Sequence, residues 1–251
     1  MHPPHVRAEA LALVEQGLND CEISRRTGIP RSTVREWRRP TNKRKTVTEV
    51  CPRCWRAAKR MWFTADDYAE LLAFYLGDGC VSEGARTARL RIALDAKYPR
   101  IIADIQALLG RCFPTNPVGI VEAHGGSMVF VSLYSTHLAC LFPQHGPGRK
   151  HERAIALEPW QQEILEAAPW PFIRGCIRTD GCAFINRTGP YEYLSYDFCN
   201  MSKDIVDLFL QACVRVDVYS RATRSPGCAW RVRINRRTSV ARMLEHVGLK
   251  E

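Results

Sequence analysis

The sequence has no apolar run that approaches the roughly 20 residues needed to cross a bilayer. Its first residues lack the basic and then apolar layout of a secretory signal peptide. Its 11 cysteines are an odd number without the spacing of a small disulfide scaffold. These absences argue against a membrane or secreted protein. They predict a cytoplasmic chain with reduced thiols, and its 251 residues suffice for one large core plus a small module or for two modest domains.

Positive charge is concentrated at one end of the sequence. The formal net charge is +10, and the first 60 residues hold 14 Lys and Arg against 6 Asp and Glu. Such a distribution favours a polyanion, and in particular nucleic acid, as partner. A basic tail that only improves solubility is the alternative, but these basic residues lie within segments of helical periodicity.

The first 40 residues have the pattern of three short helices. Apolar side chains in residues 6–16 have the spacing of an amphipathic helix. Asn19 or Asp20 can cap a second helix that runs to Arg26. Gly28 and Pro30 then separate the second helix from a third. Three helices with this turn predict a helix-turn-helix module.

The turn and the third helix resemble the helix-turn-helix of resolvases and of many small bacterial DNA-binding domains. In such modules the third helix enters the major groove of DNA. Arginine can read guanine edges there, while serine and threonine can position phosphates. A three-helix protein-interaction module is the alternative. We expect residues 1–40 to bind DNA through Arg31, Ser32, Thr33, Arg35 and Arg38.

Residues 41–65 are predicted to be a basic linker. Lys43, Arg44 and Lys45 show no apolar periodicity and can lie along phosphates. Cys51 and Cys54 are separated by two residues, a spacing at which two thiolates can bind one zinc ion. The sequence contains no second Cys-x-x-Cys, so a closed zinc site needs scattered ligands or a partner chain. Zn²⁺ is one interpretation of the pair, and two free thiols are the one we favour.

From residue 66 onward the sequence follows one plan twice. Residues 67–79 and 170–181 are apolar helical segments that both end in Asp-Gly. Small residues four apart let the two helices pack backbone to backbone. Asp78 and Asp180 would then lie together at helix C-termini, where the helix dipole disfavours a carboxylate. Two such carboxylates need a cation. The small residues are Ala73 and Gly77 in the first segment and Gly175 and Thr179 in the second.

Matching elements follow each Asp-Gly. In both halves a strand, a helix, a hairpin and a short helix precede a Gly-Lys phrase that ends at Lys150 or Lys250. The order α-β-β-α-β-β-α predicts an α+β protein built from a pseudo-two-fold pair of repeats. The expected bounds are 88–94 and 191–200 for the strands, 99–109 and 203–214 for the helices, 128–133 and 230–235 for the hairpin strands, and 136–142 and 239–246 for the short helices.

The paired Asp-Gly helices, about 100 residues apart and each followed by a Gly-Lys phrase, resemble those of a monomeric LAGLIDADG homing endonuclease. Residues 71–79 and 173–181 are the two copies of the nine-residue motif. Both copies lack the acid at the sixth position, where this sequence has Leu76 and Arg178. Both keep the acid at the eighth position. The resemblance covers residues 66–251.

The resemblance implies a DNA-binding saddle of two four-stranded sheets, with repeats at 66–157 and 158–251 and the motif helices between them. It implies a monomer that cuts both strands of double-stranded DNA at a specific site, in the nucleoid of a bacterium or phage host. The implied catalytic residues are Asp78, Asp180, Lys150 and Lys250. The implied ligands of two or three Mg²⁺ ions are Asp78, Asp180, Gly77 and Thr179. The implied sheet contacts to DNA are Arg89, Arg91, Arg231, Arg233 and Asn235.

Three alternatives stay open. A non-catalytic transcription regulator derived from such a nuclease would bind DNA without cutting it, although both acids and both lysines are retained here. The strand arginines could form a solvated sheet face. The two lysines could serve only to stabilise helix C-termini.

Overall fold

The computed structural model describes four stretches of the chain, residues 4–38, 63–84, 86–224 and 229–250. Contacts divide the chain into two units, residues 1–58 and 59–251. Within the described stretches no helix is long and apolar enough to cross a membrane. The predicted boundaries of the linker and the repeats stay predictions. The predicted linker residues Lys43, Arg44, Lys45, Cys51 and Cys54 lie outside the described residues.

The first unit contains three helices, α1 (Pro4–Glu15), α2 (Asp20–Thr27) and α3 (Arg31–Arg38). Asn19 caps α2, because its side chain accepts hydrogen bonds from the backbone of the first turn and Glu22 bonds back to Asn19. Gly28 ends α2 at a positive φ of 70°. Ala10, Ile23, Ile29 and Val34 form the buried core between the helices. The predicted three-helix module is confirmed.

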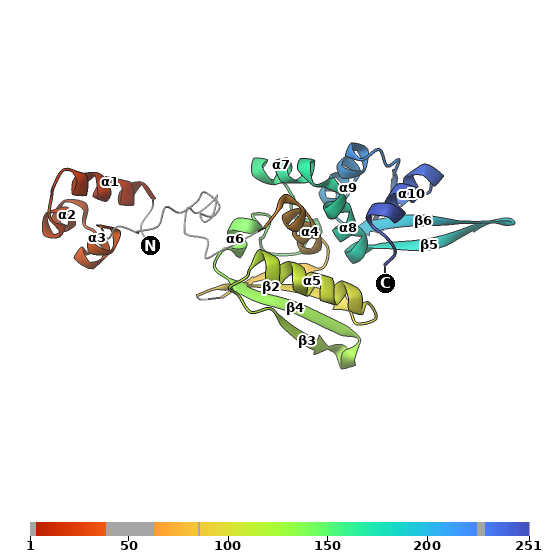
Figure 1. Ribbon diagram of the computed structural model, residues 1–251, viewed down its shortest axis with the longest axis horizontal. Helices are drawn as coiled ribbons and strands as arrows, with labels where there is room; N and C mark the ends of the chain where they lie inside the picture. The colour runs from red at the N-terminus through yellow and green to blue at the C-terminus, as the bar shows by residue number, and fades with distance from the viewer. Residues whose placement is uncertain (1–3, 39–62, 85, 225–228, 251) are drawn as a thin grey trace. The chain divides into compact units, whose positions relative to one another are not determined.

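The second unit contains the two repeats in the predicted order (Figure 1). The first repeat consists of α4 (Ala65–Leu76), β1 (Gly79–Glu83), β2 (Ala88–Asp95), α5 (Pro99–Cys112), β3 (Gly119–Ala123), β4 (Met128–Ser135) and α6 (Leu138–Leu141). The second consists of α8 (Pro169–Asp180), β5 (Gly181–Thr188), β6 (Tyr191–Asn200), α9 (Lys203–Arg215), β7 (Arg221–Arg224), β8 (Trp230–Ile234) and α10 (Arg237–His246). A helix that the sequence pattern did not predict, α7 (Pro159–Ala167), connects them.

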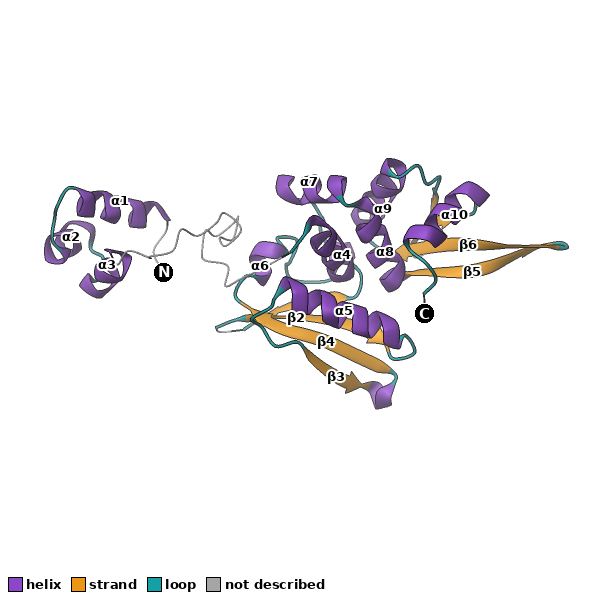
Figure 2. Cartoon of the chain, in the orientation of Figure 1, coloured by secondary structure: helices purple, strands orange, loops and turns teal. Residues whose placement is uncertain are grey.

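Each repeat forms one four-stranded antiparallel sheet, in the order β1-β2-β4-β3 or β5-β6-β8-β7. The registers correspond, since Gly79 pairs with Ile92 and Gly181 pairs with Phe198. Ile92 and Phe198 face the core, and both are almost fully buried. The strands β5 and β6 continue as a long hairpin beyond the other strands of their sheet (Figure 2).

The helices α4 and α8 lie side by side between the two sheets (Figure 1). A Cβ atom added to Gly175 would lie 2.6 Å from Cβ of Ala73, and one added to Gly77 would lie 2.4 Å from Oγ1 of Thr179. Real Cβ atoms do not approach so closely, so the two backbones can meet only because these glycines are present. The small residues therefore have the packing role that their spacing predicts.

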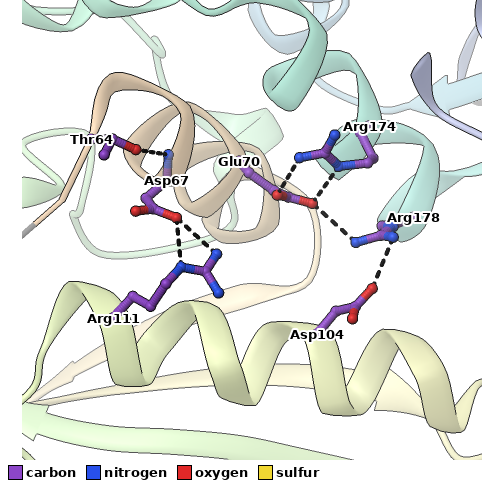
Figure 3. Close-up of polar contacts among 7 residues, drawn as sticks. All are labelled: Thr64, Asp67, Glu70, Asp104, Arg111, Arg174 and Arg178. Atoms are coloured by element: carbon purple, nitrogen blue, oxygen red, sulfur yellow. Dashed lines mark hydrogen bonds and ion pairs between the residues drawn. The ribbon is translucent and has the colours of Figure 1, made fainter.

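A group of ion pairs borders this helix interface (Figure 3). The carboxylate of Glu70 in α4, almost fully buried, accepts hydrogen bonds from Arg174 at 2.7 and 2.9 Å and from Arg178 at 3.0 Å. Arg178 also contacts Asp104 of α5 at 2.9 Å. The arginine at the sixth motif position of the second repeat therefore joins the two repeats.

Candidate functional site

The two motif aspartates lie at the same end of the helix pair. Asp78 follows α4, and Asp180 is the last residue of α8. A strand begins immediately after each aspartate, so the chain turns back beneath its own helix. A Cβ atom on Gly79 would lie 2.5 Å from Cα of Tyr75, and one on Gly181 would lie 2.6 Å from Cα of Ile177. This helix-to-strand reversal thus needs a glycine after each aspartate, and it places both carboxylates at the ends of the two motif helices.

Partial burial disfavours the ionised form of both carboxylates. Desolvation, followed by the charge of Asp180, raises the pKa of Asp78 to about 6. Desolvation also raises the pKa of Asp180, although a 2.7 Å hydrogen bond from Asn200 partly offsets that rise. In the described part of the chain no cluster of three or more His, Cys, Asp or Glu side chains completes a metal site. The pair fits a cation such as Mg²⁺, which binds one or two carboxylates and takes its other oxygens from water and phosphates.

Each Gly-Lys lysine reaches the C-terminal carbonyls of the motif helix in its own repeat. Nζ of Lys150 lies within hydrogen-bond distance of four carbonyls, those of Gly77 at 2.9 Å, Gly79 at 2.6 Å, Tyr75 and Leu76, which share its three N–H groups. Desolvation lowers the pKa of Lys150 to about 8. These contacts place a half-buried positive charge at the negative end of the α4 dipole.

Lys250 has the corresponding place in the second repeat. Its Nζ donates to the carbonyls of Thr179 at 2.7 Å and Gly181 at 3.2 Å, and desolvation lowers its pKa. The carbonyls of Gly77 and Thr179 thus both accept hydrogen bonds from ammonium groups. A metal ion bound to either carbonyl would share that oxygen with an ammonium group and would be repelled by its charge.

The acids and lysines form two crossed pairs around the ends of the motif helices. One hollow is lined by Asp180 and Lys150, and another by Asp78 and Lys250. The effects of the lysine charges on the aspartates agree with this pairing. Lys250 lowers the pKa of Asp78 more than Lys150 does, whereas Lys150 lowers the pKa of Asp180 more than Lys250 does. Each half-site therefore combines the aspartate of one repeat with the lysine of the other.

The strand arginines of the first sheet lie on its outer face. Arg89 and Arg91 in β2 alternate with the buried Leu90 and Ile92, so they point away from the core. Arg89 donates to Oγ of Ser132 at 3.1 Å. The guanidinium groups of Arg89 and Arg91 lie over the rings of Tyr134 and Phe130, both at 5.4 Å from the ring centroid. Part of each arginine stays accessible to a ligand.

Arg231 and Arg233 have the same orientation in β8, where they alternate with the buried Val232 and Ile234. With Asn235, which follows the strand, they line a shallow hollow on the outer face of the second sheet. Both arginines contact the carboxylate of Asp197 in β6. The structure thus brings the two predicted arginines of this sheet together around an acid.

The two units are similar to different known proteins. The structure resembles that of I-DmoI in complex with DNA and Mn, with a TM-score of 0.50 and 13% sequence identity over 73% of this chain and 97% of that one. Mesophilic variants of the homing endonuclease I-DmoI give the same TM-score and identity over 73% and 96%. The second unit has the LAGLIDADG fold. An N-terminal LAGLIDADG domain of DUF199/WhiA also matches, with a TM-score of 0.46 and 14% identity over 76% of this chain and 87% of that one. No curated protein matches the chain in sequence.

The first unit matches a different family, since residues 6–43 fit the model of homeodomain-like domains. On α3, the predicted residues Arg31, Ser32 and Arg35 are exposed and Thr33 is partly exposed. Arg38 lies 3.1 Å from Asp20 and also donates to the carbonyl of Leu18, so it is held within the module. The other four predicted residues have side chains that are at least partly accessible. In the described part of the chain, none of these four is held by two contacts as Arg38 is.

Two side chains near these sites were not predicted from the sequence. Asn200 holds the carboxylate of Asp180, and its counterpart in the sheet register of the first repeat is Leu94. Nothing in the sequence distinguishes Asn200 from other strand-end residues. Asp197 could have been identified from the sequence. The alternation of side chains along β6 places it on the outer face of the second sheet, together with the arginines of β8.

Proposed function

We propose that the chain is a metal-dependent endonuclease of the homing type that cuts both strands of double-stranded DNA at a specific site. The observation that carries this proposal is the pair of crossed half-sites, in which two half-buried carboxylates and two half-buried ammonium groups surround the ends of α4 and α8. Both half-sites come from one chain, so we propose that it acts as a monomer. The fold shared with I-DmoI, solved with DNA and Mn, supports this function.

Asp78 and Asp180 are the residues that would hold the divalent ions. When bound, such ions polarise the attacked phosphate and increase the acidity of water. Lys250 beside Asp78 and Lys150 beside Asp180 place positive charge where the phosphate gains negative charge in the transition state. Asn200 orients one of the carboxylates. Two half-sites of the same kind match the two strands that must be cut.

DNA would be held by the outer faces of the two sheets and by the N-terminal module. The proposed sheet contacts are Arg89, Arg91, Arg231, Arg233 and Asn235, and those of α3 are Arg31, Ser32, Thr33, Arg35 and Arg38. Arg38 must exchange its contact with Asp20 for one with DNA. A second DNA-binding module on the same chain raises the effective concentration of each module at the other's site.

One observation favours a second candidate, a regulator that binds DNA without cutting it. The ammonium groups of Lys150 and Lys250 hydrogen-bond the carbonyls of Gly77 and Thr179, as lysines that only stabilise helix ends would. A regulator would retain these contacts while bound to DNA.

Incubation of the full chain with a library of randomised DNA duplexes distinguishes the two functions. The nuclease is expected to produce double-strand breaks at one selected sequence with Mg²⁺ and none with EDTA. Selective binding without breaks would favour the regulator. A chain that neither binds nor cuts any duplex would contradict both.

A further inference from the structure

An acidic side chain lies on the outer face of the second sheet, among the arginines proposed to contact DNA. Asp197 of β6 is only 7% exposed, and its two oxygens face β8. Nε and Nη2 of Arg233 donate to Oδ1 and Oδ2 of Asp197, both at 2.9 Å. Nε of Arg231 lies 3.7 Å from Oδ2. Two parallel hydrogen bonds of this kind fix the plane of a guanidinium group.

The paired guanidinium of Arg233 keeps an unused edge. Of its five N–H groups, two point at Asp197, which leaves both hydrogens of Nη1 and one of Nη2. The ring of Phe184 lies 5.5 Å from the guanidinium and limits its movement on one side. The Arg233 side chain is still 40% exposed. Arg233 therefore presents a planar pair of donors in a fixed direction.

The first sheet has no such arrangement at the equivalent positions. Asp197 pairs with Cys182 and Arg233 across the strands, just as Arg91 pairs with Cys80 and Ser132 in the first sheet. Arg91 of the first sheet thus occupies the position equivalent to Asp197 of the second sheet.

A carboxylate on a DNA-binding face has a cost. It repels phosphates and weakens binding to any sequence. Burial of a charged pair also contributes little stability on balance. What the pair provides is orientation, and the Nη edge of a fixed guanidinium matches the O6 and N7 acceptors of guanine in the major groove.

We infer that Asp197 is a positioning residue that holds Arg233 to read a guanine in the half of the target that faces the second sheet. The inference rests on the proposed DNA binding and adds to it the base that is recognised and the residue that makes this recognition selective.

The test measures base preference in the full chain. The target is selected from randomised duplexes with Ca²⁺ in place of Mg²⁺, so that binding can be followed without cleavage. The four bases are then compared at each position. Three variants are measured beside the wild type. Asp197→Asn keeps the shape of the side chain and removes its charge, and Arg233→Lys keeps the charge and removes the fork. Asp207→Asn is the matched control, since Asp207 is an exposed acid of α9 paired with Lys203 at 2.6 Å.

The wild type is expected to prefer guanine at one position by about 5- to 150-fold, the range of a single bidentate contact. Asp197→Asn and Arg233→Lys should both lose most of this preference, and Asp207→Asn should keep it. Asp197→Asn should also bind unrelated duplexes more tightly and with a steeper salt dependence, because a negative charge leaves the DNA-binding face. A residue needed only for folding would instead weaken specific and unrelated binding together.

Three results would overturn the inference while leaving the proposed function intact. In the first, the wild type binds DNA without a preference for guanine. In the second, the Asp197→Asn variant keeps the preference. In the third, the Asp197→Asn variant loses specific binding, unrelated binding and thermal stability together. If Asp197→Asn fails to fold, Arg233→Lys decides by the same measurement. A wild-type chain that binds no duplex would refute the proposed function itself.

Discussion

Replacement of Asp78 by Asn should stabilise the LAGLIDADG unit. Burial and the nearby charge of Asp180 raise the pKa of Asp78 from 3.8 to about 6. A raised pKa means that the folded state binds the proton more tightly than the unfolded state, so stability is lost as pH rises from about 4 through 6. One pKa unit corresponds to about 1.4 kcal/mol, so ionised Asp78 lowers the free energy of unfolding by up to about 3 kcal/mol at pH 7. Asp78→Asn removes this cost.

Denaturant unfolding followed by circular dichroism, between pH 4 and 8 with EDTA, measures the effect. The stability of the variant should be close to that of the wild type near pH 4 and should exceed it increasingly up to pH 7. Added Mg²⁺ should reduce the difference, because a bound cation stabilises only the wild-type carboxylate. Asp207→Asn on the surface of α9 is the control and should show no such pH dependence. An Asp78→Asn variant as stable as the wild type or less stable at pH 7 would refute the reasoning.

Three further predictions concern packing, catalysis and the N-terminal module. Gly175→Val should destabilise the chain by about 3 kcal/mol, visible in its melting temperature, because even a Cβ would lie 2.6 Å from Ala73; an unchanged melting temperature would contradict the close helix packing. Lys150→Met should slow cleavage of one strand more than the other, so that nicked plasmid accumulates; equal loss on both strands together with lost binding would limit Lys150 to phosphate contact. Removal of residues 1–48 should weaken binding and flatten its salt dependence while cleavage persists at high enzyme concentration; unchanged affinity and footprint would show that the module does not contact the target.

Local patterns predicted much of the fold. The strand expected at 191–200, as the counterpart of the alternating strand at 88–94, is observed as β6 with the same bounds. Asn19 caps α2 through contacts within one turn. The spacing of Ala73, Gly77, Gly175 and Thr179 predicted the helix pair, since the size of a side chain limits how closely two helices approach.

Features that depend on distant partners could not be predicted in this way. The helix α7 is fixed by Gln161, which is fully buried and donates to the hydroxyl of Tyr68, a residue 93 positions away. The fork between Asp197 and Arg233 likewise depends on the register of β6 against β8. The crossed pairing of acids and lysines appears only when both repeats are in place.

Cleavage of the selected duplex in Mg²⁺ by the wild type, Asp78→Asn and Asp180→Asn, with binding measured in parallel, tests the proposed nuclease most directly. The wild type should convert the duplex into two fragments, and both variants should bind it with similar affinity but fail to cut both strands, because the carboxylates that hold the ions are absent. Full double-strand cleavage by either variant would contradict the account.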